Sequence, residues 1–138
     1  MKIKERVVVF PDIHFPNHDE DAFKCALNVI REMKPTAFLL IGDVIDGASV
    51  SHWQWAKKKR PPLEYQLPAI DKEIAQGNEG LDRIDEALNA VKCKKKQFAQ
   101  GNHELWFDHL SWWSLFRHCS CKNACFANGL QHNLWTHT

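Results

Sequence analysis

The stretch that decides the fold is RVVVFPDIH, residues 6–14. It places a run of β-branched side chains directly before Pro11 and Asp12, which is the pattern of a buried strand that stops sharply. A second stretch, AFLLIGDVID at residues 37–46, has the same order of apolar residues, a turn and acidic side chains. The two stretches predict buried strands over Arg6–Phe10 and Ala37–Ile41, each ending in a polar loop.

An amphipathic helix is expected between these strands. Asn17 or Asp19 supplies a candidate cap, and acidic residues follow where the helix has its positive end. The helix stops at Met33-Lys34-Pro35. Its apolar face is marked by Phe23, Ala26, Leu27 and Ile30. A strand, a helix and another apolar strand indicate a βαβ unit with parallel strands and a right-handed crossover.

The middle of the chain is predicted to be helical. Apolar residues recur at alternating spacings of three and four from Leu67 to Val91, and the register runs through Gly77. One long helix after Pro68 is therefore favoured, with two helices hinged near Gly77-Asn78 as the alternative. Lys94–Gln100 is then expected as a third strand, so the fold class is α/β.

Polar clusters stand where each predicted strand ends, which is where open α/β sheets place ligands and catalytic groups. Asp12 and His14, two residues apart, can hold one metal ion together, and the carboxylate of Asp43 can bridge two ions. Asn102 offers a neutral carbonyl oxygen, and His103 can donate a proton. Mixed oxygen and nitrogen ligands suit Mn, Fe or Zn ions.

These clusters resemble a known set of motifs. Asp12-x-His14, Gly42-Asp43-x-x-Asp46 and Gly101-Asn102-His103-Glu104 are similar to the first three motifs of the calcineurin-like metallophosphoesterases. That family includes phosphatases, nucleotide phosphodiesterases and nucleases, on a four-layer α/β/β/α sandwich. The resemblance implies that this chain holds the N-terminal part of such a sandwich, incomplete at the C-terminus.

The resemblance also implies roles for individual residues. Asp12, His14 and Asp43 would hold the first of two divalent metal ions, with Asp43 bridging, and Asn102 would bind the second. His103 would stabilise or protonate the leaving group, and Asp46 would orient His103 through a hydrogen bond. A metal-bound hydroxide would then attack the phosphorus of a phosphate ester in line.

The last 34 residues differ in composition from the rest. They contain only three charged residues but four of the six tryptophans and three of the five cysteines. The later histidine motifs of the family, including Gly-His-x-His, are not found there, so the second metal site is expected to be incomplete. We therefore divide the chain into a metallophosphoesterase-like part, 1–104, and an atypical tail, 105–138, produced by truncation or a shift of reading frame.

Two alternatives remain open at the sequence level. In place of an active hydrolase, the chain would be a catalytically inactive partial domain that binds a metal ion or a partner weakly, or, ranked last because of the low net charge, a basic nucleic-acid binder without catalysis. The tail has a rival interpretation as a structural zinc site. Its ligands would be Cys119, Cys121 and Cys125 with His118 or His132.

Composition limits the partners. The formal net charge of +1 in 138 residues gives no charge argument for an obligate nucleic-acid partner. Trp53 and Trp55 before the basic run Lys57–Arg60 slightly favour a phosphodiester or nucleic-acid substrate. Ala37–Ile41, the longest apolar run, is too short for a membrane span. An odd number of cysteines and the lack of a readable signal peptide predict a cytoplasmic protein.

Overall fold

The computed structural model describes residues 5–51 and 55–104. Three strands form one parallel sheet in the order β1-β2-β3. Their bounds are Val7–Phe10 for β1, Ala37–Ile41 for β2 and Lys95–Ala99 for β3. In the register, Val7 pairs with Ala37, and Ala37 pairs with Lys95. The predicted α/β class with parallel strands is confirmed. The predicted start of β1 and both predicted ends of β3 differ from the structure by one residue, while the predicted end of β1 at Phe10 and both ends of β2 agree.

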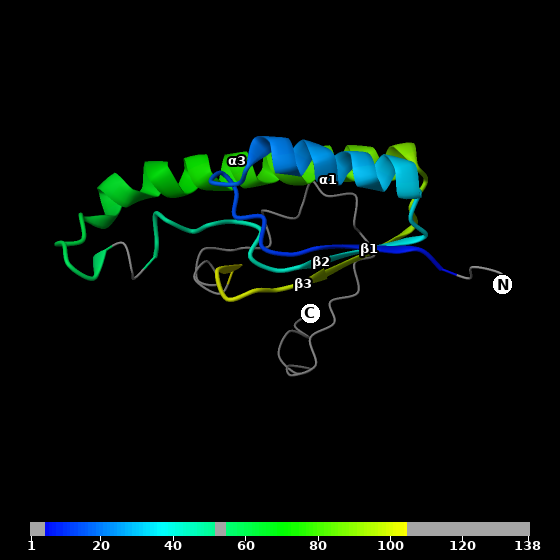
Figure 1. The fold of residues 1–138 in the computed structure, drawn as a ribbon. Coiled ribbons are helices and arrows are strands. Elements are labelled where there is room, and N and C mark those ends of the chain that lie inside the picture. The colour runs from blue at the N-terminus through cyan, green and yellow to red at the C-terminus, as the bar shows by residue number, and fades with distance from the viewer. Residues whose placement is uncertain (1–4, 52–54, 105–138) are drawn as a thin grey trace, which may run out of the picture.

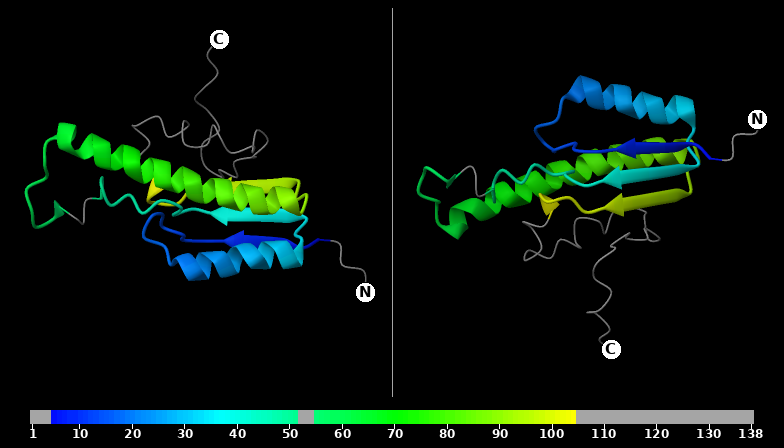
Figure 2. Two further views of the ribbon diagram at one scale, coloured as in Figure 1. Left: turned by 90° about the horizontal axis from the view of Figure 1, so that it is seen from above. Right: turned by 60° about the horizontal axis from the view of Figure 1, so that its bottom comes forward.

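Two helices, α1 (Glu20–Met33) and α3 (Leu63–Ala90), lie side by side over the same face of the sheet (Figures 1 and 2). Side chains that alternate along the strands point toward these helices and form the core. They include Val8, Phe10, Phe38, Leu40 and Phe98. The residues between them face the other way, and Val7, Val9 and Ile41 are about half exposed. One sheet face is thus buried under helices, as the period of two in a strand requires.

Helix α1 begins and ends as its sequence predicts. Asp19 is the N-cap, since its carboxylate accepts hydrogen bonds from the backbone N–H groups of Asp21 and Ala22, both at 2.9 Å. The helix ends at Met33, and the residue that caps it, Lys34, has a left-handed φ of 45°. Arg83 of α3 pairs with Glu20 at 2.7 Å, which fastens the first turn of α1 to the neighbouring helix.

Helix α3 is continuous, so the favoured single helix is confirmed and the hinge near Gly77-Asn78 is not seen. Its predicted start after Pro68 was wrong, because the helix begins at Leu63 and includes Pro68. Pro68 is the sixth residue of this helix, so it removes one helical hydrogen bond, the one to the Glu64 carbonyl, and the helix continues on both sides of it.

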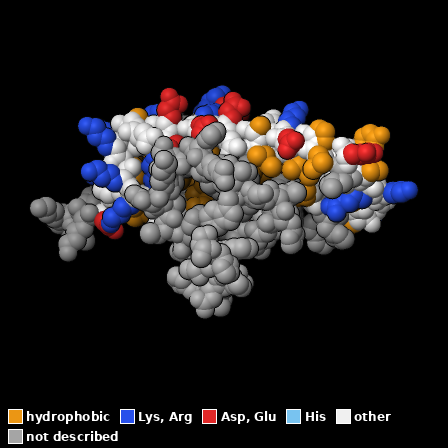
Figure 3. All heavy atoms as spheres, turned by 180° about the vertical axis from the view of Figure 1, so that it is seen from behind, with side chains coloured by type: hydrophobic (Ala, Val, Ile, Leu, Met, Phe, Trp, Pro, Cys, Tyr) orange, Lys and Arg blue, Asp and Glu red, His pale blue; other side chains and the backbone are white. Residues whose placement is uncertain are grey.

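Charged side chains cover the outer surface of the helices. Figure 3 shows Lys, Arg, Asp and Glu along the helical edge at the top of the view, with hydrophobic side chains below them. No helix within residues 5–51 and 55–104 has the length and apolarity needed to cross a membrane. The predicted tail at 105–138 and its zinc alternative lie outside the described residues.

Candidate metal centre

The loops that follow the three strands meet at one edge of the sheet. Backbone pairing between the first two strands continues beyond their ends: His14 N–H donates to the Asp43 carbonyl at 2.9 Å, and Phe15 N–H donates to the Val44 carbonyl at 2.7 Å. The Asp46 N–H returns a bond to the Phe15 carbonyl at 2.9 Å. These bonds hold the Asp12–His14 segment against the Asp43–Asp46 segment.

Two glycines bring the third loop against the second. Gly42 has a φ of 74°, and a Cβ added there would collide with the backbone of Gly101. A Cβ on Gly101 would in turn collide with Asp43. Only residues without side chains allow this approach. It lets the His103 N–H donate to Asp43 Oδ1 at 2.9 Å.

Asp12, His14 and Asp43 form a compact group of ligand atoms. One donor atom from each residue lies within 4.8 Å of the other two. All three residues have left-handed backbones, with φ values of 46°, 57° and 48°. Such conformations are costly for residues with side chains, and they cluster at functional sites where the surrounding structure holds them in place.

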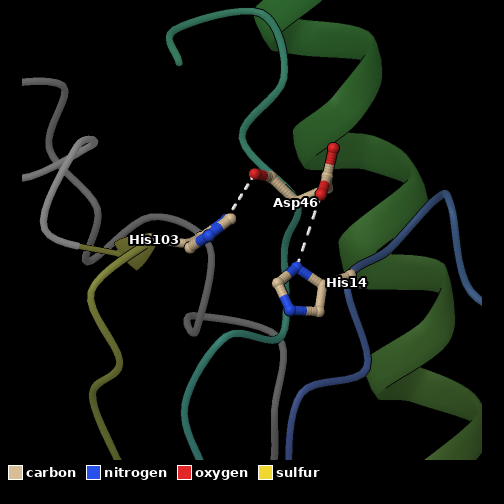
Figure 4. Close-up of side chains that lie close together, drawn as sticks. All are labelled: His14, Asp46 and His103. Carbon is tan, nitrogen blue, oxygen red and sulfur yellow. Dashed lines mark hydrogen bonds and ion pairs between the residues drawn. The ribbon is translucent and has the colours of Figure 1, made fainter. Parts of the chain in front are cut away.

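A second group shares His14 with the first. Donor atoms of His14, Asp46 and His103 also lie within 4.8 Å of one another (Figure 4). The two imidazole rings meet edge to face with their centres 4.7 Å apart. His14 Nδ1 lies 3.4 Å from Asp46 Oδ1, and the two side chains form an ion pair when the His14 ring is protonated.

The contact between Asp46 and His103 exists, but it is made by the backbone. His103 Nδ1 is 2.5 Å from the main-chain carbonyl of Asp46 (Figure 4). A carbonyl only accepts hydrogen bonds, so His103 must carry its proton on Nδ1 to make this bond. The Asp46 carboxylate instead faces His14 and accepts a bond from Asn17 Nδ2 at 2.8 Å.

Glu104 is a residue whose role sequence reasoning missed. Its side chain is fully buried, and its carboxylate accepts bonds from the N–H groups of Asp43, Val44 and Gly101 at 2.7–2.8 Å. It therefore ties the second and third loops together. The available signal was its place directly after the Asn102-His103 pair, where an acidic side chain can turn back toward backbone donors.

Helix α3 supports the loops from behind. A Cβ on Gly77 would come within 2.8 Å of Ile45, and one on Gly80 would collide with the Phe15 ring. One turn further, the buried Glu73 accepts bonds from the N–H groups of Ala48 and Ser49. Gly77 is thus explained by the close packing of a loop rather than by a bend in the helix.

The donors suit a divalent transition-metal ion. The first group offers two carboxylates and an imidazole, a mixed oxygen and nitrogen set. In addition, His14 Nδ1 is buried and makes no hydrogen bond within the described part of the chain. Asp46 Oδ1 lies 3.4 Å from this nitrogen, so either that carboxylate or a bound ion could satisfy it. Asn102 lies exposed in the turn before His103, and its role as a ligand stays a prediction.

The sequence model of the calcineurin-like phosphoesterases matches residues 5–138. The chain belongs to this family. Membership of this calcineurin-like family implies metal-dependent hydrolysis of phosphate esters, and divalent metal ions are the cofactors that the family uses. The comparison with curated proteins and the comparison with solved structures gave no match. The match includes the compositionally unusual tail, and the division of the chain at residue 104 remains a prediction.

Proposed function

We propose that the chain hydrolyses phosphodiesters, with nucleic-acid-type substrates favoured over simple monoesters. The observation that carries the catalytic proposal is the group of Asp12, His14 and Asp43, whose donor atoms converge and whose backbones are all left-handed. Asp12, His14 and Asp43 would hold one ion, and Asp43 with Asn102 would hold a second. Mn, Fe or Zn fits this donor chemistry.

A bound divalent ion would neutralise charge on the phosphoryl oxygens and make water nucleophilic at neutral pH. The protein's own contribution comes from His103. Its Nδ1–H is held by the Asp46 carbonyl, so the proton for the leaving-group oxygen must come from Nε2 of the protonated ring. Loss of that proton leaves the neutral Nδ1–H tautomer, which the same carbonyl keeps in place.

Asp46 acts on both histidines through different atoms. Its carbonyl orients His103, while its carboxylate lies beside His14 and is itself held by Asn17. The preference for diesters is supported by the exposed basic run Lys57–Arg60, where positive side chains would meet a phosphodiester backbone. Placement of the protein in the cytoplasm is part of the same proposal.

The test is hydrolysis of bis(4-nitrophenyl) phosphate and of 4-nitrophenyl phosphate with added Mn²⁺. Asp43→Asn is the inactivating variant, and Asp71→Asn on the exposed side of α3 is the matched control. We expect Mn²⁺-dependent diester hydrolysis that Asp43→Asn abolishes and Asp71→Asn leaves unchanged. A folded chain that binds Mn²⁺ but hydrolyses neither ester would instead be the non-catalytic metal binder.

A further inference from the structure

Helix α3 extends beyond the ends of the strands (Figures 1 and 2). A pocket lies along this part of the helix, beside the candidate metal centre. Its volume is about 420 Å³, within the range of roughly 300–1,000 Å³ that small-molecule sites occupy. One wall is α3 between Tyr65 and Gln76, and the other is formed by residues 16–17, 48–49, 55 and 61.

One residue joins the pocket to the metal centre. Asn17 lines the pocket, and its side-chain amide donates to Asp46 Oδ2 at 2.8 Å. Asp46 in turn is 3.4 Å from His14, one of the candidate metal ligands. The pocket therefore begins one side chain away from the site where a phosphate would bind, a separation that suits a substituent of that phosphate.

The wall of the pocket opposite α3 is held in place by hydrogen bonds to the helix. The buried Glu73 binds the backbone N–H groups of Ala48 and Ser49 and the Ser49 hydroxyl. On the same side, Gln66 donates to the Pro61 carbonyl at 2.5 Å. These bonds join α3 to both segments opposite it, so the pocket is formed without a ligand.

The lining has the chemistry that recognises a flat aromatic ring. Trp55 and Tyr65 supply two aromatic side chains, and Tyr65 is 70% exposed, more than any other large hydrophobic residue in the described part of the chain. Gln76 adds an amide that can bond to a base edge, and Lys72 adds a positive charge. Bases stack on aromatic side chains regardless of sequence, because every base has a π-face.

We propose that this pocket binds a nucleobase of the substrate, the one attached through its sugar to the phosphate at the metal centre. The assignment rests on the proposed phosphodiesterase function and deepens it, since it names the part of the substrate that is recognised. Tyr65 and Trp55 stack on the base, and Asn17 lies at the boundary between the base and the phosphate.

The test compares the affinities of AMP and ribose 5-phosphate for the full chain, measured by calorimetry or ligand-observed NMR in EDTA. Ribose 5-phosphate carries an anomeric hydroxyl where AMP carries adenine, and the two probes share the sugar and the phosphate. We expect AMP to bind about tenfold or more tightly than ribose 5-phosphate. Tyr65→Ala should remove most of this difference, and Tyr65→Phe should keep it.

Leu67→Ala is the matched control. Leu67 is a large residue on α3 that is 41% exposed and is not among the described residues lining the pocket. Its loss should leave the preference for AMP intact. Equal affinity for the two probes, no binding of either, or a preference that survives Tyr65→Ala would each overturn the proposal.

Metal-free binding separates this proposal from the proposed function. If the chain prefers AMP in a way that depends on Tyr65 but hydrolyses no nitrophenyl ester, the base pocket is supported and the phosphodiesterase function is refuted. Mn²⁺-dependent hydrolysis without any preference for AMP would support the phosphodiesterase function and refute the base pocket. Where both hold, AMP should inhibit diester hydrolysis, and Tyr65→Ala should raise its inhibition constant about tenfold.

Discussion

The carboxylate of Glu104 accepts a hydrogen bond from the backbone N–H of Asp43 at 2.8 Å, across 61 positions of sequence. It also accepts from Val44 and Gly101, both at 2.7 Å, while its side chain is entirely buried. An acidic residue with no direct place in the ligand group thus sets the position of the loop that carries Asp43.

Glu104→Gln should destabilise the fold. The new amide group would turn an N–H donor toward backbone N–H groups, leaving at least one buried donor without an acceptor. That costs about 1–3 kcal/mol of the free energy of unfolding. Urea denaturation measures it, with the exposed Glu86→Gln as a control expected within about 0.5 kcal/mol of the parent. Equal stability of the two variants would contradict the bonding role.

Gly80→Ala should also destabilise, against the expectation from helix propensity. Alanine in a helix is favoured over glycine by about 1 kcal/mol. The added methyl, however, would collide with the ring of Phe15, which is 1% exposed and closely packed. Overpacking of this kind costs about 1–3 kcal/mol, so the net effect should be a lower melting temperature.

The smaller Phe15→Leu side chain tests the cause of that loss. Combined with Gly80→Ala, it should cost less than the sum of the two single changes, since the methyl then has space. Glu79→Ala, at an exposed neighbouring position, should change stability little. If the stability lost in the double variant equals the sum of the losses in the two single variants, the collision with Phe15 is not the cause of the destabilisation by Gly80→Ala.

Asp46→Asn should leave the tautomer of His103 unchanged. The hydrogen bond to His103 Nδ1 is accepted by the main-chain carbonyl of Asp46, which the substitution keeps. The signals of His14 should shift, because the carboxylate lies 3.4 Å from its Nδ1. Long-range ¹H–¹⁵N NMR at a pH where the rings are neutral reports both, and a His103 ring protonated on Nε2 in the variant would refute the assignment.

Mn²⁺ should raise the melting temperature of the chain, because an ion that binds only the folded state stabilises it. At an ion concentration 100 times the dissociation constant, the gain is about 2.7 kcal/mol. His14→Ala should lose this shift, since His14 belongs to both groups of candidate ligands. His18→Ala is the control. His18 packs on Phe15 and Phe23, so this variant should have a lower melting temperature than the parent, but Mn²⁺ should still raise it.

The link between α1 and α3 should weaken in acid. The hydrogen bond from Arg83, followed by that from His18, lowers the pKa of Glu20 from 4.5 to about 2. A lowered carboxyl pKa contributes stability that is fully present above pH 4.5 and is lost as the pH falls toward 2. The difference in melting temperature between the parent and Glu20→Gln should therefore shrink over that range.

Because Glu20 and Arg83 lie at the surface, this difference should be small and should fall with added salt. Glu86→Gln on the same helix pair provides the control, with no comparable change between these pH values. A gap between parent and Glu20→Gln that is constant from pH 5 to about 2 would show that the ion pair does not titrate as described.

Much of the fold followed from local patterns. The β-branched run before Pro11, the cap at Asp19 and the apolar run Ala37–Ile41 each predicted an element that the structure contains. The predicted start of α3 after Pro68 was wrong, because the helix begins at Leu63 and includes this proline. A proline removes one backbone bond of a helix, and the local pattern does not show whether the turns before it stay helical.

The sequence by itself determined the class of the fold and the residues available for chemistry. Parallel strands with polar loops at their carboxyl ends follow from hydrophobic period and turn residues. Asp12, His14 and Asp43 could be named from their places after the strands, and the resemblance to the family's motifs grouped them as one set of ligands. Only the tertiary structure decided which atom makes which contact. The carbonyl rather than the carboxylate of Asp46 meets His103, and Glu104 turns back to the Asp43 loop. Such choices depend on glycine contacts and backbone angles between segments far apart in the chain, which no local pattern encodes.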